Sequence, residues 1–215
     1  MSSKEQEILI SGLSVLGLSE SHDKLDLLLK FVALIQKWNK TYNLTAIENP
    51  LDIMTLHILD SLAVLPHLKH GKIADIGTGA GLPGIPLAIY APENEYVLID
   101  SNAKKTRFVQ QALLELKLKN VSVLHTRIDQ YQPEQHFSTV ISRAFASVSE
   151  IQNSTGHLLD DHGEILAMKG DPSHQELSEI IGQYVVIPLQ VPGIEARRCL
   201  IRMQAQNNKA KTWEK

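Results

Sequence analysis

The segment KIADIGTGAGLPGIPLAIY, residues 72–90, constrains the fold of this chain more than any other segment. It begins with a short apolar run that contains one acid, Asp75, and it ends in a second apolar run. Between them stand glycines at positions 77, 79, 81 and 84. Glycine allows backbone conformations that other residues avoid, and it places no Cβ between the main chain and a ligand. The pattern predicts a strand, a tight turn and a helix, with the turn built to hold a cofactor.

Two cofactors fit this turn. Gly79, Gly81 and Gly84 satisfy the G-x-G-x-x-G pattern of dinucleotide-binding proteins, and Asp100 ends the next apolar run, where a ribose hydroxyl is bound in such folds. Asp75, in contrast, disfavours a pyrophosphate and suits a cationic ligand such as S-adenosylmethionine, which carries a sulfonium and an ammonium. The segment resembles the first motif of class I methyltransferases, so it favours the methyl donor over NAD and leaves both open.

Composition places few limits on function. The chain has 215 residues, of which 43% are hydrophobic, enough for one α/β domain with an accessory segment. Its single cysteine, Cys199, leaves no cysteine pair for a disulfide within the chain or for a multi-cysteine metal site, and no metal is expected. Neither a leader pattern nor an apolar run of membrane-spanning length is present, so we expect a soluble cytoplasmic protein without membrane contact.

The charge is unevenly distributed along the chain. The net charge of −3 argues against nucleic-acid binding, yet five Lys or Arg residues fall within 102–120 and six within 196–215. Such local basic patches are able to contact phosphate, and they are equally compatible with solvated faces and a basic tail.

Residues 1–69 are predicted to form a helical accessory segment, with one helix over 22–38. This helix leads into KWNKTYNLT, where Lys37, Asn39 and aromatic residues are interleaved, as in surfaces that stack on bases and contact phosphates. The alternative is that Trp38 and Tyr42 pack this segment onto the next domain. Further on, His57 and Asp60 are spaced to share a helix face, and a structural pair is favoured over a catalytic dyad.

Residues 70–205 alternate between strands and helices as a doubly wound α/β sheet requires. Strands are predicted at 73–76, 96–100, 121–125, 137–142 and 163–169, and helices at 102–118 and 172–182. The last two apolar runs, 184–190 and 197–203, predict an antiparallel hairpin, as in the Rossmann-like class I methyltransferase fold. Residues 206–215 are predicted to be a basic tail.

The chain resembles one family in particular. The matching runs are KWNKTYNLT, HILDS, DIGTGAGLPGIPLAI, VLIDS followed by KKTRF, ISRAFAS, MKG and LQVP. They resemble the glucose-inhibited division protein B family of bacterial 16S rRNA (guanine-N7) methyltransferases. The resemblance implies methyl transfer from S-adenosyl-L-methionine to N7 of a guanine in 16S ribosomal RNA or the small ribosomal subunit. It also implies a cofactor pocket formed by Gly77, Gly79, Leu82, Asp100, Ile128, Asp129 and Arg143. In this fold the acid at the position of Asp100 binds the ribose hydroxyls of the cofactor.

Arg143 and Lys169 follow strands at the predicted site, and we expect them, with Lys37 and Asn39, to contact RNA. The alternatives are that Leu82 is a core residue, that Asp129 is a helix cap, and that Arg143 forms an ion pair or a phosphate clamp. Guanine N7 already has an exposed lone pair, so we name no catalytic acid or base and expect alignment and desolvation to supply the acceleration. An NAD-dependent oxidoreductase and a non-catalytic RNA-binding assembly factor are the competing functions.

Overall fold

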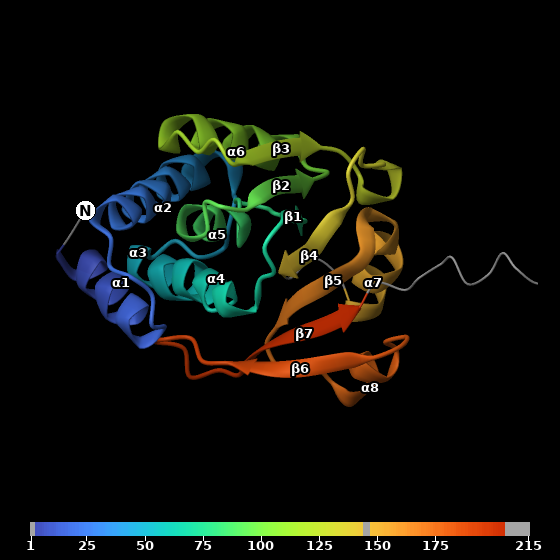
Figure 1. Cartoon of the computed structure of the whole chain (residues 1–215). Helices are drawn as coiled ribbons and strands as arrows, with labels where there is room; N and C mark the ends of the chain where they lie inside the picture. The colour runs from blue at the N-terminus through green and yellow to red at the C-terminus, as the bar shows by residue number, and fades with distance from the viewer. Residues whose placement is uncertain (1–2, 144–146, 205–215) are drawn as a thin grey trace, which may run out of the picture.

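A seven-stranded sheet forms the middle layer of the computed structural model, which describes residues 3–143 and 147–204 (Figure 1). The order of the strands across the sheet is β3-β2-β1-β4-β5-β7-β6. The strands are β1 (Lys72–Ile76), β2 (Glu95–Asp100), β3 (Val121–His125), β4 (Phe137–Arg143), β5 (Leu159–Lys169), β6 (Tyr184–Leu189) and β7 (Arg198–Gln204). The first five are parallel, and β7 runs antiparallel to both β5 and β6. The strand order reverses between β1 and β4, so the carboxyl ends of these strands form the crevice in which such folds bind ligands.

Helices cover both faces of the sheet (Figure 1). One face carries α1 (Ser3–Val15), α2 (His22–Tyr42), α3 (Pro50–Ile53), a π-helical segment at Met54–Leu59, α4 (Asp60–Leu62), α5 (Gly84–Tyr90) and α6 (Ala103–Leu116). The other face carries α7 (Val148–Thr155) and α8 (His174–Ser178). Each face has its own cluster of buried apolar side chains. No helix within the described residues is both long and apolar enough to cross a membrane.

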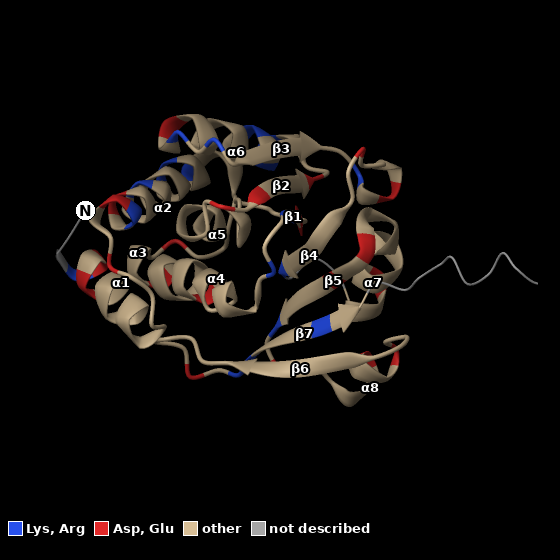
Figure 2. Cartoon of the chain, viewed as in Figure 1, with Lys and Arg blue, Asp and Glu red and all other residues tan. Residues whose placement is uncertain are grey.

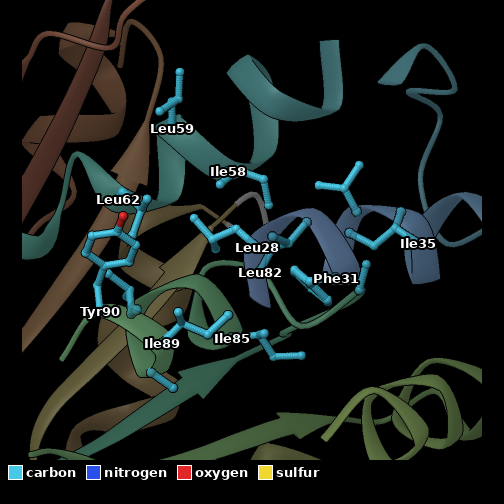
Figure 3. Packing of buried hydrophobic residues seen from close by; sticks show 14 of the residues in the cluster. Leu28, Phe31, Ile35, Ile58, Leu59, Leu62, Leu82, Ile85, Ile89 and Tyr90 are labelled. Atoms are coloured by element: carbon cyan, nitrogen blue, oxygen red, sulfur yellow. The ribbon is translucent and has the colours of Figure 1, made fainter. Parts of the chain in front are cut away.

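The N-terminal helices share one core with the sheet. Figure 3 shows the part of this core that lies between α2, α4 and α5. Apolar residues of α2 pack against the chain that follows the glycine turn and against the segment around α4. The labelled residues are Leu28, Phe31 and Ile35 of α2, Ile58, Leu59 and Leu62 around α4, and Leu82, Ile85, Ile89 and Tyr90 after the glycine turn. Trp38 of α2 also contacts Phe108 of α6, with 5.8 Å between the ring centroids. The helices of residues 1–69 therefore pack directly against the segment that follows the glycine turn and form one side of the crevice.

The predicted elements are present, and in three of them a bound differs by more than two residues. Helix α2 continues to Tyr42 and ends where Asn43 takes a left-handed conformation (φ 49°). Strand β5 begins at Leu159 rather than at 163. The helix predicted over 172–182 is only His174–Ser178, because the side chain of Gln152 bonds both the N–H and the carbonyl of Ile181 and holds that stretch in another conformation. The hairpin of β6 and β7 is confirmed, and the predicted tail at 206–215 lies outside the described residues.

Candidate active site

The glycine turn after β1 is held from behind by Asp75. The carboxylate oxygen Oδ2 accepts hydrogen bonds from the Thr78 hydroxyl at 2.7 Å and from the Gly84 N–H at 2.9 Å. A Cβ on Gly84 would come within 2.1 Å of a Leu98 methyl group and 2.8 Å of Asp75 Oδ2, so both buried side chains would have to shift to accept another residue there. Because side chains alternate along a strand, Asp75 points toward α5 and is fully buried. The sequence suggested that this carboxylate faces a cationic ligand, whereas it braces the turn, and burial raises its pKa to about 6.

Asp100, at the end of β2, supports the same turn from the other side. Its Oδ2 accepts from the Gly79 N–H at 2.9 Å, and its Oδ1 accepts from the Asn102 N–H at 2.8 Å. Gly77 and Gly79 have φ values of 68° and 59°, in the region that favours glycine. Each carboxylate oxygen can accept a second bond, so Asp100 both fixes the turn and retains acceptors for a ligand.

A cavity of about 730 Å³ lies beside Asp100, and we call it the acidic pocket. Its lining includes Gly77, Ile128, three carboxylates and one arginine; the charged residues are Asp100, Asp129, Glu150 and Arg127. The arginine is already engaged, because its guanidinium donates to Asp129 at 3.1 Å and lowers the pKa of that carboxyl. This charge suits a cationic ligand and disfavours the pyrophosphate of NAD.

A second cavity of about 750 Å³ also borders Gly77, and we call it the basic pocket. Gly79, Leu82 and Met168 are among its lining residues. Its charged lining residues are one carboxylate and four cations: Asp60, Lys105, Arg143, Lys169 and Arg198. Gly77 lines both pockets, so the glycine turn is the border between a negatively and a positively charged space.

Two arginines share a single carboxylate in the basic pocket. Arg143 Nη1 donates to Asp60 Oδ2 at 3.1 Å, and Arg198 Nε donates to Asp60 Oδ1 at 3.1 Å. Arg143 Nη1 also donates to the Leu56 carbonyl at 3.0 Å. Asp60 is 4% exposed. The ion pair that the sequence left open for Arg143 is therefore present, and it includes a second arginine.

His57 lies in the same pocket, but its imidazole does not bond the Asp60 carboxylate. Its Nε2 is 2.8 Å from the Thr45 hydroxyl, and its Nδ1 is 3.4 Å from Arg143 Nη2. Burial, and then the charge of Arg143, lower the His57 pKa to about 4. The imidazole is thus neutral at pH 7, and His57 and Asp60 are linked through Arg143 rather than as a dyad.

The remaining predicted RNA contacts have different surroundings. Lys169 lines the basic pocket, and its Nζ is 2.8 Å from a carboxylate oxygen of Glu176. Lys37 is exposed on α2, outside both pockets (Figure 2 shows the Lys and Arg residues of α2 and α6). Both ends of the Asn39 amide bond the main chain of Thr45, at 2.9 and 3.0 Å, so this side chain braces the loop after α2.

Sequence reasoning missed Arg198 as a site residue. It appeared only as one member of the basic run 196–215. Its place in the pocket depends on the antiparallel pairing of β7 with β5, which brings the first residue of β7 to the carboxyl end of the parallel strands. Among the described residues, no group of three or more His, Cys, Asp or Glu side chains is arranged to hold a metal.

Comparison with known proteins identifies close relatives of this chain. The family model GidB, described as rRNA small subunit methyltransferase G, matches residues 24–198. The Ribosomal RNA small subunit methyltransferase G of Chromobacterium violaceum is 44% identical over 199 residues, covering 91% of this chain and 95% of the relative. The protein of the same name from Coxiella burnetii is 45% identical over 203 residues, covering 94% and 98%.

Solved structures share the fold at much lower identity. A SAM dependent methyltransferase from Aquifex aeolicus has a TM-score of 0.56 and 16% identity, covering 79% of this chain and 97% of that one. M. jannaschii TYW2 in complex with AdoMet has a TM-score of 0.52 and 15% identity, covering 67% and 73%. The sheet and its helices are therefore those of class I methyltransferases.

Proposed function

Because this chain belongs to the rRNA small subunit methyltransferase G family, we propose that it transfers a methyl group from S-adenosyl-L-methionine to N7 of a guanine in 16S ribosomal RNA. Homologues at this identity over nearly the full length support the reaction and the substrate. A ribosomal substrate in turn supports a cytoplasmic site of action.

The observation that carries the proposal is the meeting of two oppositely charged pockets at Gly77. The acidic pocket fits the donor, whose charged groups are a sulfonium, an ammonium and one carboxylate, and Asp100 has acceptors free for its ribose hydroxyls. Ile128 and Asp129 complete that pocket, and Gly79 and Leu82 face the basic one. The basic pocket then takes the nucleotide, so the methyl group is transferred across the border that the glycine turn forms.

The donor supplies an electrophilic methyl group on a positively charged sulfur. The N7 lone pair forms the new N–C bond as the C–S bond breaks, and the electron pair of that bond remains on sulfur. N7 carries no proton, so the protein need not remove one, and the neutral His57 is not required as a base. The chain contributes by aligning the two reactants and by excluding water between them.

The test is labelled methyl transfer to small-subunit particles and to naked RNA, both from cells that lack this enzyme, followed by nucleoside mass spectrometry. We expect 7-methylguanosine from at least one of the two substrates. Donor binding without methylation of either substrate would overturn the ribosomal assignment and would favour a non-catalytic RNA-binding role.

A further inference from the structure

We propose that Arg198, together with Arg143, binds a backbone phosphate of the target nucleotide, and that Asp60 is the positioning residue that holds the two guanidinium groups. This inference rests on the proposed function, because it assumes that the basic pocket receives RNA. It adds Arg198 and Asp60 to the residues that serve the substrate.

The sheet brings the two arginines to one side of the crevice. Arg143 on β4 pairs with Met168 on β5, and Met168 pairs with Leu200 on β7. Residues paired across neighbouring strands point to the same face, and so do residues two apart along one strand. Arg198 stands two residues before Leu200, so both guanidinium groups lie on the face where Asp60 follows the π-helical segment.

The charges of this cluster do not balance. Asp60 offers one negative charge to two guanidinium groups whose side chains are only 17% and 26% exposed. The neighbouring His57 is neutral, and the other cations of the pocket lining are Lys105 and Lys169, the latter paired with Glu176. A half-buried excess of positive charge is unfavourable until an anion enters, since burial weakens its hydration.

Arg198 also retains a donor for that anion. Its Nε is bound by Asp60 and its Nη1 donates to the Arg197 carbonyl, whereas its Nη2 donates to no atom of residues 3–143 or 147–204. Guanidinium groups bind phosphate oxygens through several N–H groups at once. A phosphate is therefore a better partner for the two arginines than a single carbonyl oxygen.

The chemistry of the reaction points to phosphate rather than to the base. Arginine commonly reads guanine through O6 and N7, but a guanidinium on N7 would occupy the lone pair that must attack the methyl group. After transfer the base is cationic, and an arginine at N7 would then meet like charge. The two arginines are therefore compatible with the reaction when they bind the backbone of the nucleotide.

The experiment compares Arg198→Gln with Arg197→Gln in the full chain. The two residues are neighbours with the same charge, but Arg197 is 82% exposed and pairs with Asp171 on the surface. We expect Arg198→Gln to raise the KM for RNA about tenfold or more and to reduce the slope of RNA affinity against salt by about one, with donor affinity unchanged. Arg197→Gln should leave the KM for RNA within about twofold.

Asp60→Asn separates positioning from simple charge. This change makes the pocket more positive, so electrostatic attraction alone predicts tighter RNA binding, whereas loss of positioning predicts a higher KM for RNA. We expect the higher KM, with donor affinity and circular dichroism confirming that the variant is folded. Tighter RNA binding by Asp60→Asn would overturn the positioning role.

The outcomes of this experiment are distinguishable from those of the proposed function. If the wild-type protein forms no 7-methylguanosine, the proposed function fails whatever the variants do. If the wild type is active and Arg198→Gln behaves like Arg197→Gln, the function stands and the phosphate site is wrong.

Discussion

The two pockets at the glycine turn have nearly the same volume, about 730 and 750 Å³, but opposite charge and different origins. All residues that line the acidic pocket lie between 76 and 154, on the parallel strands, on the segments that follow them and on α7. The lining of the basic pocket extends from residue 44 to residue 199 and includes the N-terminal helical segment and the terminal hairpin. The proposed donor site thus lies within the parallel strands and α7, whereas the proposed substrate site also draws on the N-terminal helical segment and the terminal hairpin.

Asp100→Ala is the strongest test of the separation between the pockets. It removes one bond to the glycine turn, one bond to the Asn102 N–H and the proposed acceptor of the ribose hydroxyls, and bonds to charged groups contribute roughly 1.5–3 kcal/mol each. We expect donor affinity to fall on the order of a thousandfold, about 4 kcal/mol, in titration calorimetry. RNA affinity measured without donor should stay within about twofold, and an equal loss of both would show that the pockets are not independent.

The pKa of His57 is lowered and that of Asp75 is raised, so the two groups should affect the pH dependence of stability in opposite directions. His57, with a pKa near 4 in the folded chain against 6.5 normally, makes unfolding easier as the pH falls from 6.5 to 4. Asp75, near 6 against 3.8, makes unfolding easier as the pH rises from 3.8 to 6. Each shift corresponds to about 3 kcal/mol at most.

Denaturant titrations of two variants separate these opposing slopes. Relative to wild type, the unfolding free energy of His57→Gln should increase as the pH falls from 6.5 to 4. That of Asp75→Asn should increase, relative to wild type, as the pH rises from 3.8 to 6. If both variants change in the same direction with pH, at least one of the two groups is not buried as the structure has it.

Arg143→Gln asks which pocket this residue serves, since the sequence assigned it to both donor and RNA. We expect kcat/KM for RNA to fall about thirtyfold, or about 2 kcal/mol, because a charge-assisted contact is lost. Donor affinity should change by less than about threefold. A larger loss of donor affinity than of RNA turnover would place Arg143 in the acidic pocket.

Asp129→Asn should have the smallest effect. Its carboxylate is solvent-accessible and engaged by Arg127, so its field is screened. We expect donor affinity to fall about two- to fivefold in calorimetry, with Arg127→Gln as the matched control that frees the same carboxylate. A loss as large as that of Asp100→Ala would mean that Asp129 binds the donor directly.

Local patterns predicted most elements, because these depend on residues close together in the chain. Of the residues predicted to bind the cofactor, Gly77, Asp100, Ile128 and Asp129 line the acidic pocket, whereas Gly79, Leu82 and Arg143 line the basic one. Strand β3 has the predicted bounds, since its apolar run lies between a helix end and a loop. The orientation of Asp75 was missed although Ile73, on the same face of β1, is part of the core beneath α5. Arg198 was missed for a different reason: its role depends on a strand pairing between distant segments, which no local pattern encodes.

The antiparallel direction of β7 also has a consequence for synthesis. All the residues that line the acidic pocket have been translated once residue 154 is added, whereas the basic pocket lacks Arg198 until β7 has emerged and paired with β5. A nascent chain therefore carries every residue of the proposed donor site before it acquires Arg198, the last charged residue of the proposed RNA site. The phosphate contact that we propose for Arg198 is thus the last charged part of the site to be synthesised, in a protein whose proposed substrate is part of the machine that makes it.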